Sequence, residues 1–162
     1  MRKENELPSS IEAEKAVLGS IILEPTLWDS MSVEIDENDF ISNEHKVIFR
    51  GIKKLINLGS EIDTVTLIES LSSDKEISSL SNFDKVNYVK NLVQDTPGTA
   101  NFSNYTNIIK QSSSLRKLIS TAADISSLAK ESDTFESENA LSEAEEKLYK
   151  LRDSIQRSSG PL

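Results

Sequence analysis

The sequence predicts an all-α protein, built as a compact multi-helix globule followed by a long antiparallel helical hairpin. Apolar residues recur at helical rather than alternating spacing in nearly every segment, and proline is scarce, with four residues in 162. The strongest punctuation is the Pro97-Gly98 turn, after which two long segments run without proline or glycine. We therefore expect three parts: a globule at 1–99, a hairpin at 100–157 and a linker stub at 158–162.

The first helix is predicted within 9–24, SSIEAEKAVLGSIILE. Ser9 and Glu12 have the spacing of a capping box, and Pro25 ends the segment because proline cannot continue a helix. At about 100° per residue the apolar side chains share one face. Glu14 falls inside that face, and Gly19 sits mid-helix, where a glycine costs about 1 kcal/mol. Both exceptions require an explanation from the rest of the fold.

The middle of the globule is predicted to contain two helices. A short helix at 26–31 buries Trp28, and Phe40 returns to the core after an acidic loop. The next helix has Asn43 as its N-cap and Gly59 as its C′ residue.

Two more helices complete the globule. One covers 65–71 and is opened by Asp63 or Thr64. The other covers 82–94, and Ser81 with Asp84 resembles a capping box at its start.

The hairpin helices are expected at about 101–131 and 138–156. Each carries apolar residues at the three- and four-residue spacing of an a/d seam, which is typical of two helices packed side by side. The seams are short for an autonomous coiled coil, so their remaining apolar surface needs the globule or another copy of the chain. The seam residues expected to support self-association are Leu115, Leu118, Leu141, Leu148, Leu151 and Ile155.

Composition limits the function. The chain has no cysteine, so disulfides and thiolate metal sites are excluded, and a cytoplasmic protein is the natural interpretation. No run approaches 18 apolar residues and the N-terminal end lacks a signal-peptide core, so we expect no membrane association. The net charge of −9 argues against extensive binding to duplex DNA, and a protein partner is the better expectation.

The sequence contains no recognisable active site. There is no phosphate-binding P-loop, and His45 is the only histidine, so neither a catalytic triad nor a multi-histidine metal site can be assembled. We interpret His45 as a hydrogen-bonded histidine at the edge of the core. We expect no catalytic residue, no metal and no cofactor in this chain.

One side of the helix that follows Asn43 is basic. It could contact single-stranded nucleic acid or an acidic partner, or it could be an ordinary solvated face, which is the interpretation we favour. The residues are Lys46, Arg50, Lys53 and Lys54.

Beyond these patterns, the residues themselves resemble the N-terminal domain of the bacterial replicative DNA helicase, the DnaB family. The opening segment follows the family pattern P-x-S-I-E-A-E-x-x-[VL]-L-G, and similarity continues over about 145 residues. The matching segments are LPSSIEAEKAVLGSIIL (7–23), H-x-x-I-F (45–49), G-x-x-I-D-x-V-T-L (59–67), TPGTANFSNYTNII (96–109) and LRKLISTAADI (115–125).

The resemblance implies a non-catalytic domain. In this family the hairpins pair between subunits, and six such domains form a collar, a trimer of dimers, on a ring of ATPase motor domains. The collar recruits primase. ATP and magnesium would belong to the motor domain, whose P-loop this chain lacks.

The family pattern includes both exceptions in the first helix. Gly19 would allow another helix to approach closely. We interpret Glu14 as structural, because a carboxylate is favoured near a helix N-terminus and can accept bonds from loop amides. An interface role for Glu14 is the secondary interpretation.

The resemblance also suggests contacts with the C-terminal domain of primase. Tyrosine and arginine are enriched at binding hot spots, Ile125 lies on the seam, and Glu12 doubles as a capping residue. The candidates are Glu12, Tyr88, Arg116, Ile119 and Ile125. Two serine-rich stretches, at 111–115 and 72–82, depart from the family's character and put partner specificity in doubt.

Two alternatives stay open at this stage. The helicase-binding domain of primase shares the globule-plus-hairpin architecture, although the opening motif favours the helicase. A stand-alone adaptor or helicase loader could also use such a domain.

Overall fold

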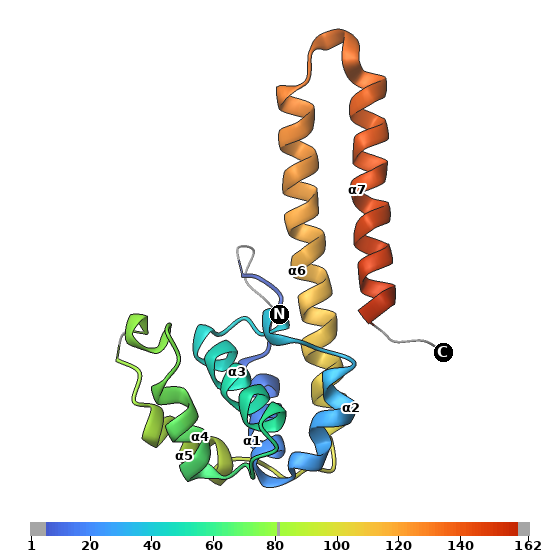
Figure 1. The fold of residues 1–162 in the computed structure, drawn as a ribbon. Coiled ribbons are helices and arrows are strands. Elements are labelled where there is room, and N and C mark those ends of the chain that lie inside the picture. The colour runs from blue at the N-terminus through green and yellow to red at the C-terminus, as the bar shows by residue number, and fades with distance from the viewer. Residues whose placement is uncertain (1–5, 81, 159–162) are drawn as a thin grey trace.

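The structure is a computed structural model that describes residues 6–80 and 82–158. Every regular element in these ranges is helical, which confirms the all-α prediction. Helices α1 to α5 form a globule, and α6 and α7 form a hairpin that extends away from it (Figure 1). None of the helices in the described ranges is long and apolar enough to cross a membrane.

Helix α1 (Ile11–Leu23) lies at the centre of the globule and packs against α3, α5 and α6. Its N-cap is Ser10, whose hydroxyl accepts a hydrogen bond from the Ala13 amide at 3.1 Å. The predicted capping box of Ser9 and Glu12 is therefore wrong: the N-cap is the next residue, Ser10. The capping hydroxyl must face the free amides of the first turn, and the helix begins one residue later than the motif suggested.

Gly19 lies where α5 (Lys85–Gln94) crosses α1. A Cβ atom at this position would lie 2.5 Å from the carbonyl oxygen of Leu92 and would also overlap the Thr96 side chain. The close approach predicted for Gly19 is confirmed.

Aromatic residues fill the core beside α1. Trp28, at the start of α2 (Trp28–Ser32), packs on Phe49 with ring centroids 4.9 Å apart. Phe40 packs on the same ring at 5.4 Å. Both predicted core residues are buried. Two short 3-10 turns, η1 (Pro25–Leu27) and η2 (Glu37–Asp39), connect this region.

Helix α3 (Asn43–Asn57) begins one residue earlier than predicted. Ser42, and not Asn43, is its N-cap, and the Ser42 hydroxyl accepts from the His45 amide at 3.3 Å. At the other end Gly59 has φ +68°, and the amides of Gly59 and Ser60 donate to the carbonyls of Ile56 and Leu55. This is a Schellman motif, which confirms Gly59 as the C′ residue.

Helix α4 (Thr64–Ser72) is capped by Asp63, which accepts from the Thr66 amide at 2.8 Å, so the first of the two predicted caps is confirmed. A 3-10 turn, η3 (Ile77–Ser79), follows. Asp84 is the N-cap of α5, in place of the predicted capping box with Ser81. Ser81 lies outside the described residues.

The hairpin consists of α6 (Phe102–Glu131), the 3-10 turn η4 (Thr134–Glu136) and α7 (Ser137–Ser158). The first half of α6 packs on α1 and buries Phe102 and Ile109, while the second half runs beside α7 (Figure 1). Helix α6 is thus one continuous helix that belongs to both parts. The division of the chain near residue 99 stays a prediction.

Candidate functional site

A buried polar network connects α1, α3 and α5. Glu14 is 1% exposed, and its carboxylate accepts bonds from the amides of Ile41 at 2.8 Å and Ser42 at 3.3 Å. Its Oε1 also lies 2.7 Å from Nδ1 of His45. Glu14 therefore closes the N-terminal end of α3, which confirms its structural role and its bonds to loop amides.

His45 continues the network to α5. Its Nε2 lies 2.6 Å from the hydroxyl of Tyr88, and its ring is fully buried. Nδ1 is hydrogen-bonded to the Glu14 carboxylate and Nε2 to the Tyr88 hydroxyl, so both ring nitrogens have a partner. His45 is thus a satisfied core histidine, as predicted.

Tyr88 is the half-buried end of this network. Burial raises the pKa of its hydroxyl to about 12, and the negative charges of Glu44, Glu14 and Glu12 act in the same direction. The hydroxyl therefore stays protonated at neutral pH and keeps its hydrogen bond with His45. The backbone position and orientation of Tyr88 are set by the core rather than by solvent.

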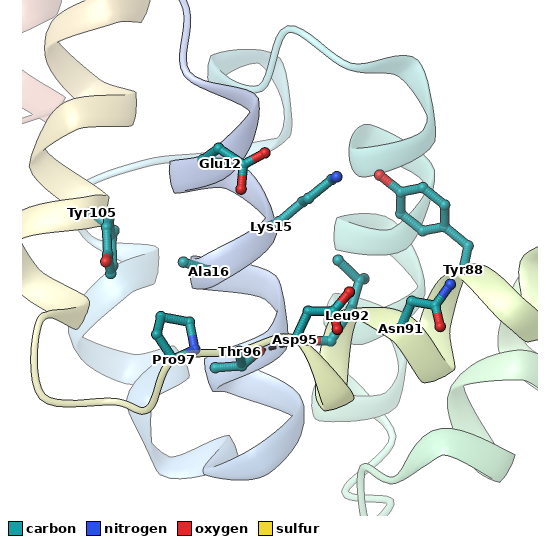
Figure 2. Close-up of a pocket in the computed structure, with 10 residues that line it drawn as sticks. All are labelled: Glu12, Lys15, Ala16, Tyr88, Asn91, Leu92, Asp95, Thr96, Pro97 and Tyr105. Carbon is teal, nitrogen blue, oxygen red and sulfur yellow. Dashed lines mark hydrogen bonds between the residues drawn. The ribbon is translucent and has the colours of Figure 1, made fainter.

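Tyr88 and Glu12 line one pocket of about 450 Å³ between α1, α5 and the start of α6. Figure 2 shows Lys15 of α1 pointing toward Tyr88 across this space. Its walls combine apolar surface with carboxylate, amide and amine groups, a mixture suited to one side chain of a protein partner. The other lining residues are Ala16, Asn91, Leu92, Asp95, Thr96, Pro97 and Tyr105.

Arg116, a third candidate contact, is held by the fold. Its guanidinium donates to the carbonyl oxygens of Pro8 at 2.7 Å and Asp39 at 2.6 Å. It thereby fastens the segment before α1 and the η2 turn to α6. No local pattern points to these two backbone acceptors, because they lie more than 70 residues away from Arg116 along the chain.

The remaining candidates, Ile119 and Ile125, lie on the hairpin. Ile119 is 46% exposed, as suits a contact residue, whereas Ile125 is partly buried between α6 and α7. The structure thus brings Glu12 and Tyr88 together at one pocket and places the other three candidates along α6.

The hairpin seams are only partly closed within one chain. Leu151 and Ile155 are partly buried, whereas four leucines of the seams and the neighbouring Ile119 remain exposed. At about 100° per residue, and because the two helices run in opposite directions, these five side chains lie on the same face of the hairpin. We call them the hairpin stripe: Leu115, Leu118, Ile119, Leu141 and Leu148.

The predicted basic side of α3 is partly paired with acids. Arg50 donates to Glu37 at 2.6 Å and to both oxygens of Asp74. The hydrogen bonds with Asp74 raise the pKa of Arg50 and lower that of Asp74. Lys54 donates to Ser73 at 2.9 Å. Local contacts thus account for part of this surface, with ion pairs at Arg50 and Lys53 and a hydroxyl bond at Lys54, which fits an ordinary helix face.

Metal binding finds no support in residues 6–80 and 82–158, where no group of three or more His, Asp or Glu side chains could hold a metal ion. The ionisable groups of the pocket also lack a nucleophile paired with a base. The arrangement suits binding rather than chemistry.

Comparison with known proteins agrees with this description. Residues 6–111 match the model of the DnaB-like helicase N-terminal domain. The replicative DNA helicase DnaB of Buchnera aphidicola subsp. Baizongia pistaciae is 37% identical over 157 residues, which cover 96% of this chain and 33% of that protein. The same helicase of Pasteurella multocida is 33% identical over 144 residues, covering 89% and 30%.

Solved structures share the fold. The N-terminal domain of DnaB helicase from Mycobacterium tuberculosis superposes with a TM-score of 0.78 at 20% identity, covering 90% of this chain and 99% of that one. A DnaB-like replicative helicase, studied for its interactions with primase, has a TM-score of 0.62 at 22% identity, covering 93% and 37%.

The chain spans about a third of the length of the two curated relatives. The part to which it corresponds is their N-terminal domain, which is itself non-catalytic. The family match over residues 6–111 establishes that this chain belongs to the DnaB-like helicase N-terminal domains, and its fold agrees with that of a solved member.

Proposed function

We propose that this chain is the collar domain of a replicative DNA helicase, which self-associates through its hairpin and recruits primase to the replication fork in the cytoplasm. The observation that carries the proposal is the pocket that joins Glu12 and Tyr88, two residues chosen from the family resemblance alone. A helicase loader is a further candidate partner. ATP and magnesium would act in the motor domain of the whole helicase.

Self-association is supported by the hairpin stripe. Five exposed apolar side chains on one face of a two-helix hairpin form a surface that a second copy can cover. A dimer is the simplest assembly, and a trimer of dimers is the form that the family resemblance suggests.

Primase recruitment is supported by the chemistry of the pocket. Tyr88 offers an aromatic face held in place by His45, and Glu12 adds an exposed carboxylate that has no role in the cap of α1. Rigid aromatic residues beside a charged group are typical of binding hot spots. We propose that the C-terminal domain of primase inserts a side chain here.

Glu12→Ala is the cleanest test. Glu12 is exposed, so its loss should leave the melting temperature unchanged, and binding to the primase C-terminal domain should weaken about tenfold. Glu69→Ala, which removes an exposed carboxylate from α4, is the matched control and should bind like the wild type. Titration calorimetry measures both.

The outcomes separate the alternatives. If the wild-type chain does not bind primase, the loader or adaptor alternative is favoured. If the wild type binds and Glu12→Ala binds equally well, the contact lies elsewhere. The helicase-binding domain of primase is no longer required as an alternative, because the family match is to the helicase.

A further inference from the structure

The pocket between α1, α5 and the start of α6 has a tyrosine on each of two sides. Figure 2 shows Tyr105 on the α6 side and Tyr88 on the α5 side, and both rings are partly buried. The ring of Tyr88 is fixed by its neighbours, since Phe83 and His45 pack on it with ring centroids 5.4 and 5.8 Å away. Its hydroxyl is bonded to His45, so the ring is the part of Tyr88 that remains available to a partner.

Three charged side chains line the same pocket without a partner of their own. Glu12 and Asp95 are carboxylates and Lys15 is an amine, and all three are exposed. Within residues 6–80 and 82–158 none of the three forms an ion pair or a side-chain hydrogen bond. These charges are therefore free to meet another molecule.

The electrostatic balance of the pocket is negative near Tyr88. The carboxylates of Glu44, Glu14 and Glu12 all act on the Tyr88 hydroxyl in the direction that raises its pKa. Lys15 points toward Tyr88 from α1 (Figure 2), which places a cation of the chain itself in this negative region. Charge complementarity therefore favours a cationic guest over an anionic one.

We propose that this pocket takes an arginine side chain of the partner protein, received by the carboxylates of Glu12 and Asp95 and by the ring of Tyr88. Lys15 then competes with that arginine for the same negative charges. A guanidinium group is planar, stacks on aromatic rings and bonds to carboxylates through parallel N–H groups, so it can use both kinds of wall at once. This assignment rests on the proposed function, in which primase inserts a side chain into the same pocket.

A small probe tests the charge of the guest without primase. In an NMR titration, N-acetyl-arginine amide should shift the backbone amide signals of Tyr88, Asn91 and Tyr105, with a Kd on the order of 10 mM for so few atoms. N-acetyl-citrulline amide has nearly the same shape but no charge, and it should bind about threefold more weakly at matched ionic strength. Equal binding of the two probes, or no binding of the arginine probe, would overturn the proposal.

Variants of the pocket charges test its walls. Glu12→Gln and Asp95→Asn should each weaken binding of the arginine probe about threefold, whereas Lys15→Met should tighten it by a similar factor. Glu69→Gln in α4 and Lys90→Met in α5 remove exposed charges outside the pocket, so these matched controls should bind like the wild type. If Lys15→Met leaves the affinity unchanged or lowers it, Lys15 does not compete with the guest and the assignment is wrong.

Titration with the primase C-terminal domain separates the guest from the partner. Each arginine of that domain is changed to glutamine in turn, and each variant is titrated against the wild-type chain and against Glu12→Gln. For the arginine that enters the pocket, the loss of affinity should be about tenfold with the wild type and much smaller with Glu12→Gln.

The two titrations fail in different ways. If primase binds but none of its arginines is coupled to Glu12, the arginine guest is overturned and the proposed function stands. If the arginine probe binds as expected and primase does not bind, the arginine site stands and the proposed partner is wrong.

Discussion

Glu14 accepts three hydrogen bonds in the core, from two loop amides and from His45. The His45 ring passes the connection to Tyr88 at the surface pocket. One carboxylate inside an apolar face thereby orients the start of α3 and the aromatic ring that we propose contacts primase. The stability of the fold and the proposed primase contact therefore share one buried network.

Glu14→Gln should destabilise the fold by about 2 kcal/mol, because an amide cannot replace the carboxylate at all three donors and leaves a buried donor unsatisfied. Urea denaturation measures the loss. Glu12→Gln is the matched control two residues earlier, and it should change stability by less than about 0.5 kcal/mol since Glu12 is exposed. Equal effects of the two substitutions would contradict the role given to Glu14.

Tyr88 should make the free energy of unfolding fall as the pH rises through the alkaline range. Its pKa is about 12 in the fold, above the ordinary value of 10.0. The unfolded chain therefore loses this proton first, so the contribution of Tyr88 is complete below about pH 10 and is lost as pH rises toward 12. Urea denaturation across this range should show a steeper loss for the wild type than for Tyr88→Phe. Parallel profiles would mean that burial of the hydroxyl has no such effect.

At the scale of elements, two features decide how the globule and the hairpin meet. They are the crossing of α1 and α5, and the continuous helix α6, which packs on both α1 and α7. Gly19 lets α5 lie against α1, which in turn places Tyr88 beside Glu12. Arg116 fastens α6 to the segment before α1 and to η2. These contacts fix the hairpin relative to the pocket.

Gly19→Ala tests the crossing. In an exposed helix this change would stabilise by about 1 kcal/mol, but here the new methyl group meets the Leu92 carbonyl, so we expect a loss of about 1–3 kcal/mol. Gly51→Ala in α3 is the control. Its methyl group would meet only the side-chain ends of Leu71 and Leu67, at 3.0 and 3.1 Å, so a smaller change is expected. Thermal melting ranks the two, and a stabilised Gly19→Ala would contradict the close contact.

For the whole molecule, the projecting hairpin leaves apolar surface that one chain does not cover. The globule buries its own core, whereas the hairpin, which projects from the globule (Figure 1), leaves the five side chains of the hairpin stripe exposed. In the proposed function, the hairpin provides assembly and the pocket on the globule provides partner recognition.

Leu148→Asp should abolish self-association without unfolding the chain. Leu148 is 44% exposed in the single chain, so the charge remains solvated in a monomer but would be buried and unpaired in a dimer. Leu151→Asp is the comparison: because Leu151 is partly buried within the hairpin, this change should also lower the melting temperature. Light scattering and thermal melting together separate the effects. A wild-type chain that is already monomeric would contradict the proposed assembly.

The sequence by itself determined the helical class, the long hairpin, the buried roles of Trp28 and Phe40, and the motif at Gly59. These features arise from periodicity and local backbone chemistry, which act over a few residues. Only the tertiary structure decided that Ser10 and Ser42 cap their helices, that Tyr88 bonds to His45, and that Arg116 is held by distant carbonyls. The tertiary structure also decided which seam residues are partly buried within the hairpin and which stay exposed. Caps one residue apart differ little in local energy, and bonds between residues distant in the chain exist only once the helices have packed.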